Sequence, residues 1–369
     1  MTLLTASILM PAGDPLGCAV PPALFLALSY LTLTLHFLAM NFTVGGAILL
    51  IVARLGKGRD GAASVRFLAT ALPLGFSYLV TFGVPPLLFV QVLFGQLFYS
   101  SSVLVGTFWI LVIPALVLAY AGFYYHKLAA GSASRKGTLV VLCSLALMLF
   151  VGFVYVNNLT LMQTPGKWLA TYTAHPGGAT LNLSERTLVP RYAFFILPGL
   201  VVAGIAFVLR GAYLDRWGRE EEGRASRRFG ARAMLVGAVL AWTAAGGLLA
   251  TLPAAIRSFV LGGGLPTGLA GGWLALSLGS IACGLAAAPR KGLALPFASA
   301  LLWACAVGCI VALRNLVRLE YLKGFFSLDA MPVNAQWGMF AVFAVTLVLG
   351  LALLVFLMVR IFPRLARRP

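Results

Sequence analysis

The stretch PALFLALSYLTLTLHFLAMNFTVGGAILLIVA, residues 22–53, decides the fold of this chain. It contains no Asp, Glu, Lys or Arg. About 20 apolar residues in an α-helix suffice to cross the hydrocarbon core of a bilayer. The stretch therefore predicts a membrane-spanning helix. His36, one of only 3 histidines in the chain, lies well inside it.

Composition extends this prediction to the whole chain. The 369 residues are 61% hydrophobic and 10% charged, with a mean hydropathy of +0.98, which excludes a soluble globular domain. The sequence predicts an all-α polytopic membrane protein, with about nine transmembrane helices in a single integral-membrane domain over residues 1–369. The apolar runs lie near 22–53, 67–98, 103–126, 137–160, 192–209, 233–256, 268–288, 293–314 and 336–359.

The distribution of basic residues predicts the orientation of these helices. Most of the 27 lysines and arginines fall in alternate connections, and basic loops mark the cytoplasmic side. We therefore expect the N-terminus outside and the C-terminus in the cytoplasm, with residues 1–21 as a short external lead-in. The net charge of +18 is interpreted as this signal and as contact with lipid head groups, rather than as binding of nucleic acid. The basic connections are 54–66, 127–136, 210–232, 290–291 and 360–368.

His36 is an ionisable side chain at membrane depth, and such groups are costly enough that a functional role is the first hypothesis. A neutral imidazole binds haem iron without bringing a charge into the membrane, so His36 is a candidate haem ligand. The alternative is a histidine that is hydrogen-bonded to a neighbouring helix. The 5 cysteines form no Cys-x-x-Cys pair, so covalent haem attachment and a zinc site lack support.

A dense polar block, Asn157 to Gly166, follows the fourth apolar run. Its residues Asn158 and Gln163 are candidates for the wall of a pocket that holds a quinone head group or haem propionates. The alternative is helix capping followed by a tight turn. Arg314 and Arg318 form a second candidate, because residues four apart share one helical face and guanidinium groups bind carboxylates bidentately. Snorkelling of these arginines to the interface is the alternative.

Two of these segments resemble a known family. The residues His36-Phe37-Leu38, followed by Thr43-Val44-Gly45, resemble the first-helix signature of subunit I of cytochrome bd quinol oxidases. The block from Asn157 to Gly166 is similar to that family's Asn-Gly-Trp-Met-Gln-x-Pro stretch. The resemblance covers residues 22–210, as helices 1–5, whereas helices 6–9 in residues 211–369 agree only in topology. It implies that His36 is an axial ligand of a b-type or d-type haem, with quinol as substrate.

The chain also departs from that family at positions that matter for catalysis. Phe194 stands where the family has its low-spin haem histidine, in the sequence Arg191-Tyr192-Ala193-Phe194. Residues 61–184 contain no Asp or Glu, so the family's proton-carrying glutamates are missing. The connection near 257–267 is too short to be the family's quinol-binding loop, and the Gly-Arg-Gln-Pro-Trp signature is absent. An autonomous oxygen reductase is therefore not expected.

The resulting expectation is a membrane-embedded redox subunit of a respiratory electron-transfer complex in the bacterial cytoplasmic (inner) membrane. It would bind haem, quinone or both, and pass electrons between the quinone pool and other subunits or an external c-type cytochrome. The alternatives are a haem-free scaffold or assembly subunit and a small-solute transporter. The absence of acidic groups in the apolar runs and of an internal repeat speaks against a transporter. His126 and His175 receive no assigned role.

Overall fold

The computed structural model describes residues 11, 13–55, 59–129 and 135–366. These residues form helices, and their only β-structure is an isolated bridge between Cys18 and Val333. Nine helical segments of the described chain are long and apolar enough to cross a membrane, so the predicted fold class is confirmed. Three of the basic residues that predict the orientation, Lys57, Arg367 and Arg368, lie outside the described residues, as do residues 1–10 and 12 of the predicted lead-in.

The nine spans are formed by eleven named helices, because two of the spans are interrupted. The third span is divided at Leu111, and the fifth is divided around Leu197 and Pro198. The spans are α2 (Pro22–Leu55), α3 (Arg59–Leu93), α5 with α6 (Gly106–Ile110, Val112–Leu128), α7 (Arg135–Met162), α9 with α10 (Leu188–Ile196, Gly199–Arg216), α11 (Glu220–Thr251), α13 (Gly264–Ala287), α14 (Ala294–Tyr321) and α15 (Trp337–Ala366). The shorter helices are α4 (Gly95–Leu104), η1 (Pro165–Lys167), α8 (Trp168–Ala174) and α12 (Ala254–Leu261).

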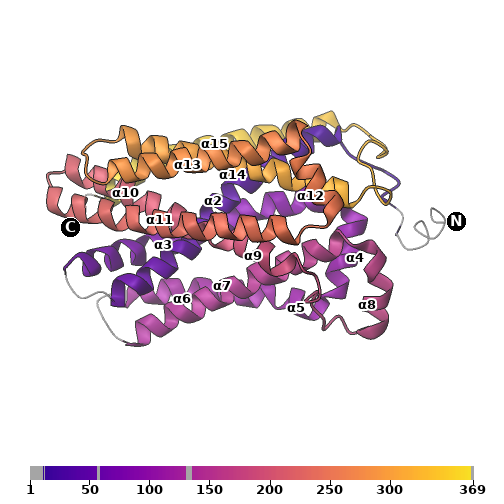
Figure 1. The fold of residues 1–369 in the computed structure, drawn as a ribbon, viewed down its shortest axis with the longest axis horizontal. Coiled ribbons are helices and arrows are strands. Elements are labelled where there is room, and N and C mark those ends of the chain that lie inside the picture. Colours follow the sequence, from indigo (N-terminus) through magenta and orange to yellow (C-terminus); the bar gives the residue numbers. More distant parts are fainter. Residues whose placement is uncertain (1–10, 12, 56–58, 130–134, 367–369) are drawn as a thin grey trace.

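The spans lie along one direction in an elongated bundle (Figure 1). The short helices α4, α8 and α12 cover the end at which α2 begins, which we call the N-terminal end of the bundle. The connection from α10 to α11 lies at the opposite end, where α15 also ends. The predicted alternation of loops therefore agrees with the fold. Which end faces the cytoplasm stays a prediction from the basic residues.

Helix α2 occupies the centre of the bundle, where it contacts α3, α7, α9, α10 and α14. It approaches α10 closely, because a Cβ atom on Gly45 would collide with the carbonyl of Gly199. Small residues allow this proximity in membrane bundles, where packing rather than hydrophobic expulsion holds helices together. Leu50, Leu72 and Phe207 belong to the buried cluster that joins α2, α3 and α10. Neighbouring helices therefore contact α2, the helix that carries His36, from several sides.

The connection between α10 and α11 is held by a buried ion pair. Arg227 on α11 pairs with Asp215 on α10, and their side chains are only 2% and 5% exposed. The Arg227 guanidinium also donates from Nε to the carbonyl of Ala288, 3.3 Å away, at the end of α13. Three helices are thus fastened together at the end of the bundle opposite the N-terminus.

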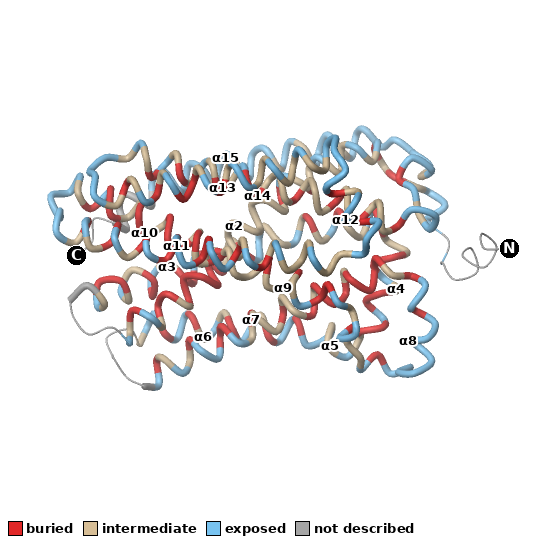
Figure 2. The backbone as a smooth tube through the Cα atoms, viewed as in Figure 1, coloured by how far each residue is buried: buried red, intermediate tan, exposed pale blue. Residues whose placement is uncertain are grey.

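Helix α15 differs from the other spans. None of its most apolar stretch is buried within the protein, and over residues 337–360, for which burial is described, it has no buried residue (Figure 2). One ring contact joins it to α3, between Phe343 and Phe89, whose centroids lie 6.4 Å apart. Its start is fixed more firmly, because the segment before it pairs with the segment before α2 through the bonds Cys18 N to Pro332 O and Asn334 N to Cys18 O.

Candidate functional site

His36 projects from α2 onto α3, where its Nδ1 atom lies 3.0 Å from the carbonyl oxygen of Leu79. A carbonyl only accepts hydrogen bonds, so Nδ1 carries the proton and Nε2 keeps its lone pair. Nε2 has no hydrogen-bond partner among the described residues. The hydrogen bond to a neighbouring helix, which was the alternative interpretation of His36, is thus present. It is also the arrangement in which an imidazole is ready to bind a metal through its other nitrogen.

Gly83 makes this position of His36 possible. A Cβ atom on Gly83 would lie 2.9 Å from both Cε1 and Nδ1 of His36. Because Gly83 has no side chain, the imidazole can lie against α3 and reach the Leu79 carbonyl. The sequence interpretation did not identify Gly83. The only signal for it is a glycine on the apolar run that precedes Pro85 and Pro86, and α3 continues as a helix through both prolines.

The middle of α2 is not fully enclosed, although α2 lies at the centre of the bundle. Every residue from 33 to 40, His36 included, keeps partial exposure. Aromatic rings form one side of this region: the ring centroids of His36 and Phe37 lie 6.0 Å apart, and Phe37 stacks on Phe195 at 5.3 Å. Phe194, at the position of the family's missing histidine, packs edge-on against Trp273. The imidazole is therefore accessible beside an aromatic wall.

Arg314 and Arg318 lie on α14, one helical turn apart, and they are not equivalent. The charge of Arg314 acts on His36 and on Arg318. Arg318 is only 2% exposed, and its guanidinium lies 4.9 Å from the centroid of the Phe94 ring. Snorkelling therefore does not describe Arg318. Arg191, at the start of α9, is a third buried cation within electrostatic range of both, so the structure brings together three arginines rather than two.

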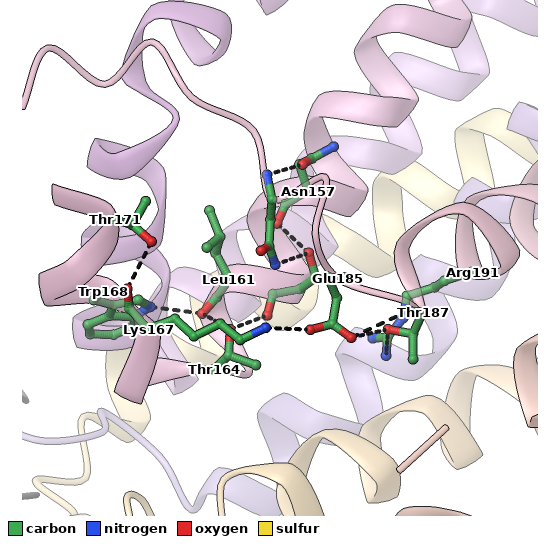
Figure 3. A network of polar contacts seen from close by, with 11 residues as sticks. Asn157, Leu161, Thr164, Lys167, Trp168, Thr171, Glu185, Thr187 and Arg191 are labelled. Atoms are coloured by element: carbon green, nitrogen blue, oxygen red, sulfur yellow. Dashed lines mark hydrogen bonds and ion pairs between the residues drawn. The ribbon is translucent and has the colours of Figure 1, made fainter. Parts of the chain in front are cut away.

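Arg191 is held by the polar segment that follows α7. Its Nη1 donates to Gln163 Oε1 at 2.7 Å, and its Nη2 donates to Thr187 Oγ1 at 3.4 Å. Figure 3 shows Arg191 beside Thr187 at one side of a network that continues through Glu185 to Lys167. The predicted site residue Gln163 is thus part of the arginine cluster. Sequence reasoning did not include Arg191, whose signal is a basic residue immediately before an apolar run.

Asn158 lies apart from this cluster. It donates from Nδ2 to Ser102 Oγ on α4, 3.0 Å away, and joins α7 to the N-terminal end of the bundle. Its neighbour Asn157 accepts from the backbone amide of Asn182 at 2.8 Å. The backbone bonds from Thr164 to Leu161 and from Lys167 to Thr164 form the tight turn that was the alternative interpretation of this block. The turn is present, and Gln163 has an additional contact to a buried charge.

Glu185 lies outside the spans, and its charge acts on Arg191. Partial burial raises its pKa, while the hydrogen bond from Lys167, the Lys167 charge and hydrogen bonds from Thr187 lower it. The net result is a pKa below the ordinary value for glutamate. Its Oε2 atom accepts from Lys167 and its Oε1 atom accepts from Thr187 Oγ1. Glu185 is therefore ionised, and both of its oxygens are already engaged.

A small cavity lies on the other side of Phe37, among α2, α9, α13 and α14. Its volume is about 30 Å³, and Asn41, Trp273 and Trp303 are among the residues that line it. Asn41 Oδ1 and Trp303 Nε1 are both buried without a hydrogen-bond partner. One acceptor and one donor thus face a space that holds about one water molecule. A larger, open cleft of about 550 Å³ lies at the N-terminal end, between residues 184–186 and the residues that join α11 to α12.

The other two histidines lie away from His36. His126 is buried at the end of α6, with Nε2 3.5 Å from Arg54 Nη2, and His175 is exposed at the end of α8. Within the described ranges, no group of three or more His, Cys, Asp or Glu side chains could hold a metal ion. A haem needs only one such ligand, so this finding does not test the His36 assignment. No protein-family model and no curated protein matches the chain.

Proposed function

We propose that the protein is a membrane-embedded redox subunit of a respiratory electron-transfer complex in a bacterial cytoplasmic membrane. In this role it binds a b-type or d-type haem through His36 and passes electrons between the quinone pool and a partner protein. The observation that supports this best is the 3.0 Å hydrogen bond from His36 Nδ1 to the Leu79 carbonyl. It selects the neutral tautomer in which Nε2 keeps its lone pair, and Nε2 has no hydrogen-bond partner among the described residues.

The residues around His36 fit such a group. The imidazole has an unengaged Nε2 atom, and the surrounding part of α2 is partly exposed, so a planar ligand can approach it. Arg314 is the cation whose charge reaches His36, and it would hold a propionate. A bound haem would supply one-electron redox chemistry. The role of the protein would be to hold the haem through His36 and to orient it through Arg314. Phe37 and Phe195 would exclude water from it.

The arrangement supports electron transfer rather than autonomous oxygen reduction. Phe194 offers no ligand atom, and its ring is fully engaged with Trp273 and Phe195. The cavity near Phe37 is smaller than a quinone ring, so we assign no ring-binding pocket there. Quinol is proposed as the electron donor that reaches the bundle from the lipid, and a protein outside the bundle, such as a c-type cytochrome, is proposed as the partner.

A haem-free scaffold or assembly subunit is the second candidate, and α15 is the observation that favours it. A span with none of its most apolar stretch buried in its own chain is suited to contact lipid or the helix of another subunit. Both candidates make this protein part of a larger complex. They differ in whether His36 has a ligand.

The absorption spectrum of the purified, dithionite-reduced protein distinguishes the two candidates. We expect a b-type or d-type haem band in the wild type and its loss or strong shift in His36→Ala. His175→Ala is the matched control, because His175 is exposed at the end of α8 and should leave the band unchanged. A wild-type protein that is folded and shows no haem band would contradict the proposal and favour the scaffold.

A further inference from the structure

The cluster of Arg191, Arg318 and Tyr321 contains more hydrogen-bond donors than it uses. Arg191 Nε, Arg318 Nε and Arg318 Nη2 are all buried without a hydrogen-bond partner, and the Tyr321 hydroxyl is buried next to Arg191. Arg191 and Arg318 are 8% and 2% exposed, so bulk water cannot supply the missing hydrogen bonds. A buried guanidinium without a counter-charge is costly. The geometry therefore lacks a negatively charged acceptor.

No acidic side chain of the described chain forms an ion pair with Arg191 or Arg318, and Glu185 acts on Arg191 only through its charge. The ion pairs among the described residues all involve other arginines and lysines. The acidic residues nearest in sequence to the cluster already have partners. Glu185 binds Lys167 through Oε2 and Thr187 through Oε1, while Glu320 pairs with Lys323. Arg314 adds a further positive charge one turn along α14. The cluster thus carries a net positive charge.

The donors are held in place without a ligand. Gln163 fixes Arg191 through Nη1, at 2.7 Å, and leaves its Nε free to donate. The Phe94 ring supports the Arg318 guanidinium from one face, so its N–H edge is available in the plane. The Arg191 guanidinium lies 5.9 Å from the centroid of the Tyr321 ring, which brings the Tyr321 hydroxyl into the same group. The donors of α9 and α14 thus lie close together, because the charge of Arg191 acts on Arg318 and its guanidinium lies against the Tyr321 ring.

We propose that Arg191, Arg318 and Tyr321 form a binding site for an oxyanion, with phosphate as its chemical class, at the N-terminal end of the bundle. Guanidinium edges match the paired oxygens of phosphate, and the tyrosine hydroxyl supplies a third, neutral donor. The phosphate of an anionic lipid and free inorganic phosphate share this chemistry. The site uses neither His36 nor iron, so it is independent of the proposed redox role.

The test uses the purified full-length chain in a neutral detergent. The midpoint of thermal unfolding is recorded during separate titrations with phosphatidylglycerol, inorganic phosphate and phosphatidylcholine. We expect the wild-type midpoint to rise with phosphatidylglycerol or with inorganic phosphate, which identifies the source of the anion, and to rise less with net-neutral phosphatidylcholine. Binding of an anion to the folded state alone raises the midpoint in this way.

Variants assign the response to the site. Arg318→Gln should weaken the apparent affinity for the anion roughly tenfold or more, the factor expected for loss of a charged donor. Without added anion it should be at least as stable as the wild type, because it removes a buried unpaired charge. Tyr321→Phe, which removes only a hydroxyl, should weaken binding less. Arg257→Gln is the control, since Arg257 is exposed on α12 at the same end of the bundle.

Equal responses of the wild type, Arg318→Gln, Tyr321→Phe and Arg257→Gln to every anion would overturn the proposal. So would a wild-type midpoint that neither phosphatidylglycerol nor inorganic phosphate raises. His36→Ala should retain the full anion response. The failure of the haem assignment and the failure of the anion site therefore give different results.

Discussion

Gly83 and His36 are in direct contact, and a methyl group on Gly83 would lie 2.9 Å from two atoms of the imidazole. The position of the histidine therefore depends on a residue of another helix that has no side chain. This relationship makes the orientation of His36 testable without any assumption about its ligand.

Gly83→Ala should displace the imidazole from the Leu79 carbonyl. Overpacking costs about 1–3 kcal/mol, while alanine is favoured over glycine in a helix by about 1 kcal/mol, so we expect a net loss of stability. The measurement is the midpoint of thermal unfolding in detergent. Gly246→Ala on α11, where nothing lies within 4 Å of the added atom, is the control and should be neutral or slightly stabilising. Equal midpoints for the two variants would show that the His36 contact is not tight.

Asn41 and Trp303 should behave as a coupled pair. If one water in the 30 Å³ cavity bridges Asn41 Oδ1 and Trp303 Nε1, either substitution, Asn41→Leu or Trp303→Phe, breaks the same bridge. Each should cost about 1 kcal/mol, and the double variant should cost less than the sum. A double-mutant cycle of unfolding free energies measures this coupling. Strict additivity would exclude the bridge.

Asp215→Asn should be among the most destabilising single changes in the chain. It leaves the 2% exposed Arg227 side chain without its counter-charge, and breaking a buried pair in this way costs about 3–5 kcal/mol. Glu220→Gln, which disturbs the exposed pair with Lys291, should change stability far less, because solvent screens an exposed ion pair. Chemical unfolding of both variants provides the comparison. Similar losses for the two would contradict the structural role of the buried pair.

Stability should fall in acid partly through Glu185. Its pKa in the folded protein lies below the ordinary value of about 4.3, so the folded state binds fewer protons than the unfolded state. The contribution is therefore complete above the ordinary pKa and is lost as the pH falls through the lower, folded-state pKa. Thermal unfolding midpoints from pH 6 down to about pH 3 should decline less steeply in Glu185→Gln than in the wild type. Parallel curves would mean that Glu185 makes no such contribution.

Oxygen uptake provides a further prediction. The purified protein, supplied with a reduced short-chain quinol, should not consume oxygen at a rate typical of a respiratory oxidase. The reason is that Phe194 offers no ligand to a second haem, and residues 61–184 contain no carboxylate to carry protons. An oxygen electrode makes the measurement. Sustained uptake that His36→Ala abolishes would show that other residues supply both functions, with His126, His175 and Glu320 the first to test.

Hydropathy predicted the spans well, because nearly every residue of a helix that crosses the hydrocarbon core must be apolar. It was poorer at their ends. The sixth run was predicted to begin near 233, whereas α11 begins at Glu220. Three glutamates occupy its first turn, where negative charge stabilises the helix N-terminus, so the helix extends into a charged segment that hydropathy does not detect.

The candidate site was predictable in part. Depth alone identified His36, and spacing of four identified Arg314 with Arg318. Arg191 and Gln163 come into contact only because of the turn through η1 and the position of the short helix α9. No regular sequence spacing predicts such a contact. Asn158 is only a few residues from Gln163, yet it points to α4, because neighbouring positions of a helix and its terminating turn face different directions. Gly83 was missed because its significance comes entirely from the ring beside it.

The backbone pairing of Cys18 with residues 332–334 has a mechanical consequence for α15. One end of this helix is tied to the start of α2, whereas its length is held to the bundle by little more than the contact of Phe343 with Phe89. A helix attached in this way can tilt about its fixed start, at the N-terminal end of the bundle. A small tilt at the start of α15 displaces its far end by much more than its start, so the lipid or protein beside α15 sets the position of that end.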